Sequence, residues 1–225
     1  PRQKAILKPL TLPPGTNRDE MASMVRFQVE KDLPFAPEDS VIDFTVTSHL
    51  DLAEQSLGPD ETAGVSVLAG AVSSDVVAHY QEIAHAAGIK LRRLGLRPYA
   101  NLKCVDACVR RSEEELILSV HITSDETEIN VLKGNSLAFC RSALVDVPVG
   151  TPDQQAHSVD SVVREIVRSV HSYSSAQHQG EISAVLIAGG TGIETSVLQR
   201  VAAKLKIQCE ALSPATAMDL PTQGG

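Results

Sequence analysis

The residues best suited to chemistry are the run Gly189-Gly190-Thr191-Gly192, which separates an apolar segment from an amphipathic one. At a strand-to-helix turn of this kind, main-chain N–H groups can bind a phosphate. Thr191 and Glu194 also have the spacing of a capping box, which would satisfy the same N–H groups internally, and the Glu194 charge would repel a phosphate. The run has neither the Lys of a P-loop nor the spacing of GxGxxG. We therefore favour a purely structural turn, with phosphate binding as the alternative.

A second candidate is the turn between Ile122 and Thr127, which we expect at the same edge of the sheet as the glycine run. A phosphate-holding hairpin would carry Asp, Gly and Thr there, and only Thr127 has a suitable type at a plausible position. Asp125 and Glu126 could hold a metal ion, but paired acids at a hairpin tip more often form a solvated turn. We predict no metal ligand and no catalytic residue, and the candidate cofactor-binding residues are Thr127, Gly189, Gly190, Thr191 and Gly192.

The other reactive side chains form no recognisable constellation. The seven histidines are scattered, and no Ser/His/Asp or Cys/His arrangement stands out. None of the four cysteines forms a CxxC pair, and no histidine spacing beside them suggests zinc. Cys104 and Cys108 would share one face of a helix. We expect buried free thiols in a reducing compartment.

The composition excludes several classes of protein. Aromatic residues make up only 3% of the 225 residues and Trp is missing, so the core must be aliphatic. The net charge of -8 argues against nucleic acid as a partner, because phosphate binding requires a basic surface. No apolar run approaches the roughly 20 residues of a membrane helix, and we find no signal peptide. Because the chain starts at Pro1, we expect a natural N-terminus further upstream.

The first ninety-odd residues predict a small α+β unit. Asn17 and Glu20 form a capping box before a helix that must end near Leu33-Pro34. Ser73 or Ser74 would cap a second helix, and Gly88 would end it. The predicted strands are Ala5–Leu12, Val41–Ser48, Gly64–Ala71 and Lys90–Leu96, with a loop at Leu50–Thr62. The second helix should turn an apolar face to the core, made of Val76, Val77, Tyr80, Ile83, Ala84 and Ala87.

The rest of the chain predicts a different architecture. A helix over Arg97–Arg111 is followed by three strands that alternate in hydrophobicity, the last two joined by the hairpin turn Lys133-Gly134-Asn135-Ser136. A helix capped by Thr151 comes next, and then the continuous apolar strand Ile182–Ala188. The glycine run, another helix and a short strand at Ile207–Glu210 complete the series, and the tail from Ser213 should fray. Three antiparallel strands, helix, strand, helix, strand is the ribonuclease-H-like order.

Several segments together resemble the type IV pilus assembly protein PilM and its relatives, including the type II secretion protein GspL. These are actin-like proteins akin to the cell-division protein FtsA. The resemblance covers most of the chain in the right order. The matching stretches are VRFQVEKDLPFAPEDSVIDFTV from Val25, HYQEIAHAAGI from His79, Leu118–Arg141 as the second phosphate hairpin, VREIVRS from Val163, and VLIAGGTG from Val185 as the nucleotide turn.

The departures from this family concern its nucleotide site. Members that bind ATP have Asp-x-Gly in the hairpin strand, where this chain has His121-Ile122-Thr123. Histidine cannot position a magnesium-bound water as a carboxylate does, and threonine lacks the backbone freedom of glycine. Only a short loop between Val145 and Val159 stands where the family has the subdomain that closes over adenine. The first phosphate hairpin would precede Pro1.

We therefore predict an α/β protein: a ribonuclease-H-like (actin-like ATPase) domain with a smaller α+β subdomain. The subdomain would span residues 1–92 and the ribonuclease-H-like half-domain residues 115–212. Residues 93–114 would be a helical remnant of a first half-domain with its linker, and residues 213–225 a flexible tail.

The resemblance implies a non-enzymatic cytoplasmic scaffold in a type IV pilus or type II secretion inner-membrane platform. Its partner would be the cytoplasmic tail of an inner-membrane protein like PilN, with self-association also possible and no nucleic acid bound. The protein would lie at the membrane through this partner, without a span of its own, and with no cofactor. One alternative is an ATP-binding switch or phosphotransferase of the actin and sugar-kinase superfamily, using ATP and Mg²⁺. Another is a small-molecule-binding module unrelated to pili.

Overall fold

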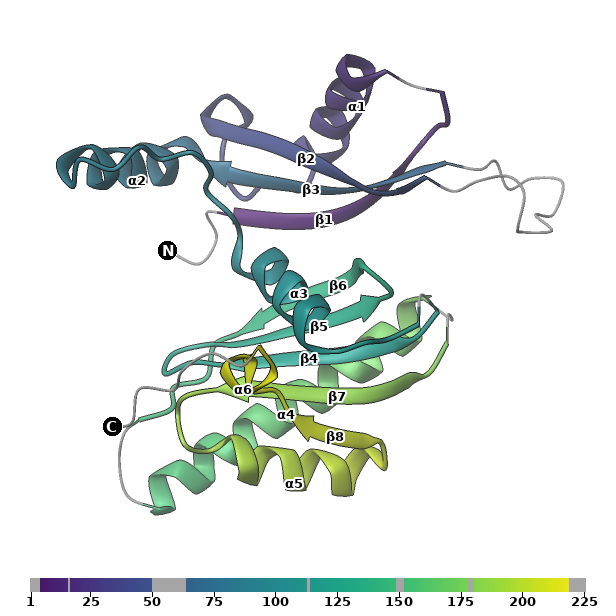
Figure 1. Ribbon diagram of the computed structural model, residues 1–225, viewed down its shortest axis with the longest axis vertical. Helices are drawn as coiled ribbons and strands as arrows, with labels where there is room; N and C mark the ends of the chain where they lie inside the picture. Colours follow the sequence, from purple (N-terminus) through teal and green to yellow (C-terminus); the bar gives the residue numbers. More distant parts are fainter. Residues whose placement is uncertain are drawn as a thin grey trace, which may run out of the picture. The chain divides into compact units, whose positions relative to one another are not determined.

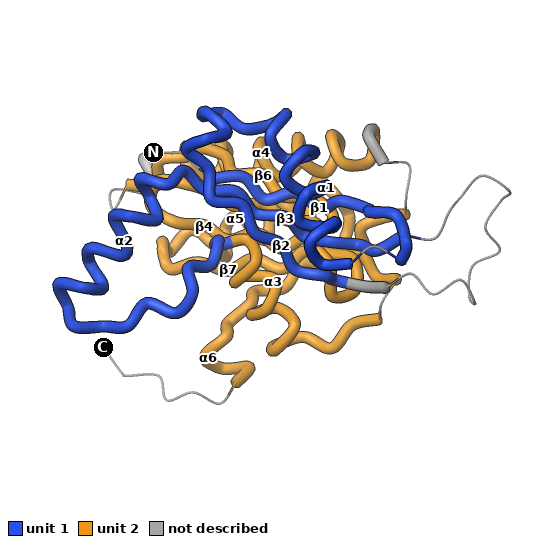
Figure 2. The backbone as a smooth tube through the Cα atoms, turned by 90° about the horizontal axis from the view of Figure 1, so that it is seen from above, with its two compact units in different colours: residues 1–97 blue, residues 98–225 orange. Residues whose placement is uncertain are grey.

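The chain folds into two compact units, residues 1–97 and residues 98–225 (Figure 2). The computed structural model describes residues 5–15, 17–49, 64–112, 114–148, 152–177 and 180–218. The predicted loop Leu50–Thr62, the predicted cap Thr151 and the end of the tail lie outside these residues. Each unit is built around a sheet of its own.

The first unit is a three-stranded antiparallel sheet with a helix on one face (Figure 1). Its strands are β1 (Ala5–Leu12), β2 (Ser40–His49) and β3 (Val65–Ser73), with β3 in the centre, and a short 3-10 helix (Pro37–Asp39) precedes β2. Helix α1 (Arg18–Glu30) buries Val25 and Val29 completely against alternate residues of the strands. The capping box is confirmed, since the Asn17 side chain accepts from the Asp19 and Glu20 N–H groups and the Glu20 carboxylate accepts from the Asn17 N–H.

Two predictions for the first unit are wrong. Lys90–Leu96 is not a strand, because the segment crosses the face of the sheet and pairs with no edge: the Leu96 Cδ1 lies 3.3 Å from where a Cβ on Gly70 would be. Helix α2 (Ser74–Ala86) buries Ala84 alone of its expected core face, while Tyr80 is 47% and Ile83 50% exposed. Figure 1 shows the reason for this exposure: α2 continues from β3 and extends past the sheet.

The second unit is a mixed five-stranded sheet in the order β6-β5-β4-β7-β8. Its strands are β4 (Leu116–Ile122), β5 (Thr127–Lys133), β6 (Ser136–Ala143), β7 (Ile182–Gly189) and β8 (Gln208–Ala211). The first three form an antiparallel meander, and β7 and β8 add in parallel on the other side of β4. The hairpin between β5 and β6 turns at Gly134, whose φ of 49° favours glycine.

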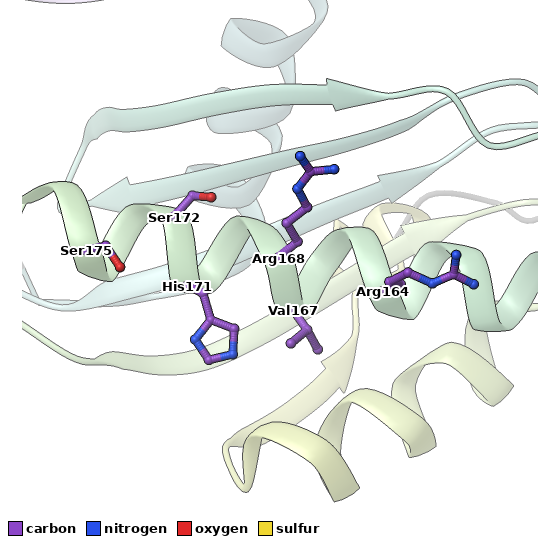
Figure 3. Close-up of a pocket in the computed structure, with 6 residues that line it drawn as sticks. All are labelled: Arg164, Val167, Arg168, His171, Ser172 and Ser175. Atoms are coloured by element: carbon purple, nitrogen blue, oxygen red, sulfur yellow. The ribbon is translucent and has the colours of Figure 1, made fainter.

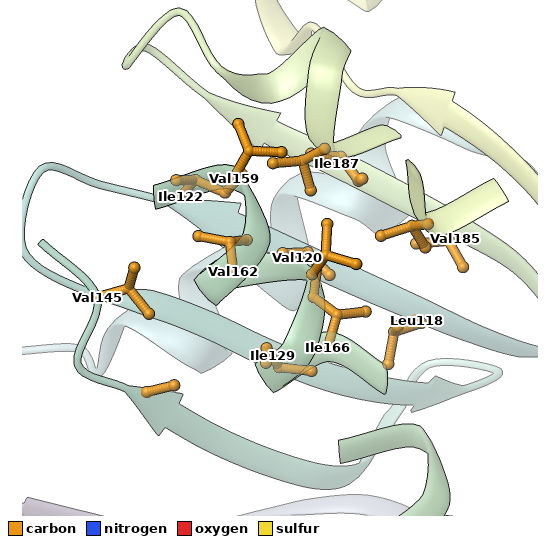
Figure 4. Packing of buried hydrophobic residues seen from close by; sticks show 14 of the residues in the cluster. Leu118, Val120, Ile122, Ile129, Val145, Val159, Val162, Ile166, Val185 and Ile187 are labelled. Atoms are coloured by element: carbon orange, nitrogen blue, oxygen red, sulfur yellow. The ribbon is translucent and has the colours of Figure 1, made fainter. Parts of the chain in front are cut away.

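Helices cover both faces of this sheet (Figure 1). Helices α4 (Pro152–Gln177) and α5 (Glu194–Leu205) lie on one face, and α3 (Arg97–Cys108) lies on the other. The aliphatic core predicted from the composition fills the space under α4 and α5 (Figure 4). Its fully buried members include Leu118, Val120, Ile129, Val162 and Ile166.

The boundaries of the second unit differ from the expected ones in detail. Helix α3 ends at Cys108, three residues before the predicted end, and the expected fraying tail contains a four-residue helix, α6 (Pro214–Ala217). The boundary between the two compact units falls after Arg97 in the sequence, so α3 belongs to the second unit. Its interpretation as a remnant of a first half-domain stays a prediction.

Candidate functional site

The two candidate turns follow neighbouring parallel strands. In the register between β4 and β7, Ile122 lies beside Gly189, so the turn after β4 and the glycine run both leave the same edge of the sheet. Ligands of open α/β sheets bind at the carboxyl ends of parallel strands. This edge is therefore the natural place for a binding site.

The side chain of Thr127 does not open onto this edge. Thr127 begins β5 on the same face as Ile129 and Val131, which belong to the core under α4, and it is 0% exposed. Its Oγ1 is buried without a hydrogen-bond partner among the described residues. Thr127 and Gly189 both lie beside Ile122 in the strand registers, so Thr127 reaches the same edge of the sheet, but its side chain is buried in the core. Its assignment to phosphate binding stays a prediction.

The glycine run holds an anion that belongs to the chain itself. The Glu194 Oε1 accepts hydrogen bonds from the Thr191 N–H and the Thr191 hydroxyl, both at 2.7 Å, and Oε2 accepts from the Gly192 N–H at 2.8 Å. The predicted capping box is wrong in its details. The N-cap of α5 is Ile193, and the Thr191 hydroxyl donates to the carboxylate where a capping box would have it accept from the backbone. The expected outcome holds, because these N–H groups are satisfied internally.

The surroundings of Glu194 stabilise its charged form. Burial favours the neutral acid, but the hydrogen bonds from Thr191 and Gly192 outweigh it and hold the pKa of Glu194 below its usual value. Gly189 makes room for this arrangement: a Cβ there would lie 2.3 Å from the Glu194 Oε1 and 2.7 Å from the Ile122 carbonyl oxygen. Glycine is therefore required at 189 by close approach.

A cavity of about 410 Å³ opens beside this turn, between α3, the ends of β4 and β7, and α6. Its described lining includes Gly189 and Glu194 but no Lys or Arg. A phosphate placed there would meet the Glu194 carboxylate without a fixed counter-charge. The cavity is consequently poorly suited to a nucleotide's phosphates.

A buried polar cluster lies behind the cavity, under α3. Glu128 is 2% exposed, and its Oε1 accepts from the Asn101 amide at 2.6 Å and the Asn130 amide at 2.8 Å. Burial, together with the Glu128 and Glu126 charges, raises the pKa of the nearby Cys140 thiol to about 12. The sequence contained no signal for this cluster, because a polar residue in an alternating strand normally faces water.

His121 stands where ATP-binding relatives would have a carboxylate. It lines the cavity, and its Nδ1 is buried without a hydrogen-bond partner among the described residues. The expected turn at Asp125-Glu126 is held by its own chain, since the Thr123 N–H and hydroxyl both donate to the Glu126 carbonyl at 2.9 Å. No group of three or more described acidic, histidine or cysteine residues could hold a metal ion.

A second hollow, of about 560 Å³, runs along the exposed side of α4. Figure 3 shows that all six side chains lining it come from this one helix. Among the described residues, no second element adds polar groups to this lining, so the hollow is a weaker candidate than the cavity beside the glycine run. Within the described part of the chain, no helix is both long and apolar enough to span a membrane.

Comparisons with known proteins agree with this architecture. A family model described as type IV pilus assembly protein PilM matches residues 1–145. The structure is similar to a chain in the PilM–PilN type IV pilus biogenesis complex, with a TM-score of 0.77 and 20% identity, covering 95% of this chain and 68% of that one. It is also similar to a Bacteroides thetaiotaomicron protein of unknown function with an actin-like ATPase fold, with a TM-score of 0.50 and 8% identity, covering 97% and 69%. No curated protein sequence matches the chain.

The meander, the two parallel strands and the glycine turn thus define an actin-like fold, as the order of elements predicted. Because the family model covers more than half of the chain, the class can be narrowed. This chain belongs to the type IV pilus assembly protein PilM family.

Proposed function

We propose that this chain is a non-enzymatic cytoplasmic scaffold of a type IV pilus or type II secretion inner-membrane platform, with a degenerate nucleotide site. Its family membership supports the pilus role, and the Glu194 carboxylate in the glycine turn carries the second part of the proposal. A phosphate would have to displace a negatively charged group that is tethered two residues away. His121 and the absence of Lys and Arg from the described cavity lining point the same way.

Isothermal titration calorimetry with Mg-ATP tests this proposal. We expect no heat of binding at micromolar concentrations of the protein. Micromolar binding that is lost in Gly190→Asp would overturn it and favour the ATP-binding switch or phosphotransferase. Gly190 suits this test because no atom lies within 4 Å of a Cβ built there, so a longer side chain would enter the turn without disturbing the core.

The proposed partner is the cytoplasmic tail of an inner-membrane protein resembling PilN, through which the scaffold would lie at the membrane. The PilM–PilN complex among the similar structures motivates this choice. The first unit offers apolar surface for such a tail, since Tyr80, Ile83 and Ile89 are 47%, 50% and 64% exposed. Exposed apolar residues that cluster in sequence and space commonly mark protein-binding surfaces.

A pull-down with juxtamembrane peptides of candidate inner-membrane partners tests this part. We expect one peptide to be captured by the wild-type chain and by Phe27→Asp, but not by the double variant Ile83→Asp/Ile89→Asp. Phe27 is a matched control because it is 65% exposed on α1, away from α2 in sequence and in its unit. Failure to capture any peptide, or equal capture by both variants, would contradict the proposed surface.

A further inference from the structure

The cavity beside the glycine turn has the size and the walls of a small-molecule site. Its volume of about 410 Å³ falls within the usual range for ligand pockets, and it lies at the carboxyl ends of two parallel strands. Val105 of α3, Ala188 of β7 and Leu212 beside α6 supply apolar surface from three sides. A compact organic molecule would bury its apolar body against them.

Its polar groups are few and lie at defined places. Ser119 is 5% exposed and lines the cavity. His121, two residues further along β4, lines the same wall, and its Nδ1 atom is buried without a hydrogen-bond partner among the described residues. A ligand with one hydrogen-bonding group on its ring could satisfy a polar atom that the fold leaves unpaired.

The charges around the cavity select the sign of the ligand. The Glu194 carboxylate forms part of the wall, and the buried Glu128 lies directly behind Asn101, which lines the cavity and donates to it. No described lining residue is Lys or Arg, and the whole chain has a net charge of -8. A cation in this low-dielectric space would be attracted by both carboxylates, whereas an anion would be repelled.

We propose that this cavity binds a small organic amine, with its ammonium group toward Glu194 and its apolar body between α3 and β7. This activity is separate from the proposed binding of a membrane-protein tail, whose surface lies on the first unit. The amine site includes the glycine turn, but amine binding there does not depend on phosphate binding.

Three probes that share one ring system test the charge preference on the whole chain. Tryptamine is a cation, indole is uncharged and indole-3-acetate is an anion at neutral pH. By calorimetry and ligand-observed NMR, we expect tryptamine to bind at least about tenfold more tightly than indole-3-acetate, with indole in between. Equal affinities for the three probes, or no binding of any, would overturn the proposal.

Two variants locate the binding. Ala215→Trp should fill the cavity and abolish tryptamine binding, whereas Ala217→Trp, on the exposed side of the same short helix and outside the cavity lining, should leave it unchanged. Glu194→Gln should weaken tryptamine to the affinity of indole without changing indole itself, which reports that the cavity is still folded. Tryptamine binding that survives Ala215→Trp would place the ligand elsewhere and refute the assignment.

Discussion

Replacing Glu194 by alanine should destabilise the second unit in a way that depends on pH. The substitution removes the acceptor of three hydrogen bonds, two from main-chain N–H groups in the turn that precedes α5. Glu194 satisfies these N–H groups as an N-cap side chain would; loss of an N-cap side chain costs about 0.5–2 kcal/mol, and bonds to a charged acceptor favour the upper half of that range. Because Glu194 is half-buried, water can accept hydrogen bonds from some of the freed N–H groups in its place. We therefore expect the free energy of unfolding to fall by about 1–1.5 kcal/mol at pH 7.

The sign of the pH dependence follows from the lowered pKa of Glu194. A carboxyl group with a folded pKa below its unfolded value contributes stability that is fully present above the unfolded pKa. That contribution is lost as the pH falls through the folded pKa. The difference between wild type and Glu194→Ala should therefore be constant from pH 6 to 8 and shrink below about pH 4.5.

Urea denaturation followed by circular dichroism measures this difference, and hydrogen exchange of the α5 amides assigns it to the second unit. Glu181→Ala is the matched control, because it removes the same charge from an exposed position just before β7. Equal stability of Glu194→Ala and wild type at pH 7 would refute the view that the carboxylate holds the turn. A loss that persisted unchanged at pH 3 would refute its electrostatic origin.

Three further predictions concern packing and reactivity. Gly189→Ala should cost about 1–3 kcal/mol in the free energy of unfolding, since its Cβ would lie 2.3 Å from the Glu194 Oε1, whereas Gly190→Ala should be nearly neutral because its Cβ meets no atom within 4 Å. Leu118→Ala, at a 0% exposed core position, should cost about 2–5 kcal/mol in the same urea titration. Cys140 should resist alkylation by iodoacetamide at pH 8 until urea unfolds the chain, because burial and nearby carboxylates raise the pKa of its thiol to about 12.

Features with local causes were predictable from the sequence. The Asn17–Glu20 capping box forms as expected because its hydrogen bonds join residues no more than three positions apart. Gly134 turns the hairpin for the same reason. The alternating apolar residues of β4, which include Leu118, Val120 and Ile122, face the core under α4 and α5. The ribonuclease-H-like order of strands and helices was predictable because these local signals all indicate the same architecture.

Features that depend on distant parts of the chain were not predictable. Lys90–Leu96 has the length and composition of a short strand, but it pairs with neither edge strand of the first sheet, β1 or β2. Leu96 packs over Gly70 of the central strand β3 instead. Glu128 occupies a polar position of β5 that would face water if α3 did not cover it. The helical periodicity of α2 predicts an apolar face, but it cannot show whether that face packs on the core. In the structure α2 extends past the sheet, and most of this face is not buried.

In both turns at the carboxyl edge of β4 and β7, main-chain N–H groups donate to acceptors within the same turn. The Thr123 N–H and hydroxyl bind the Glu126 carbonyl after β4, and Thr191 and Gly192 bind Glu194 after β7. An intramolecular group of this kind acts at a very high effective concentration, so a free phosphate at millimolar levels competes poorly with it. The actin-like framework does not depend on these donors being open, because its core lies under α4 and α5. The fold therefore does not require these two turns to remain open to a ligand.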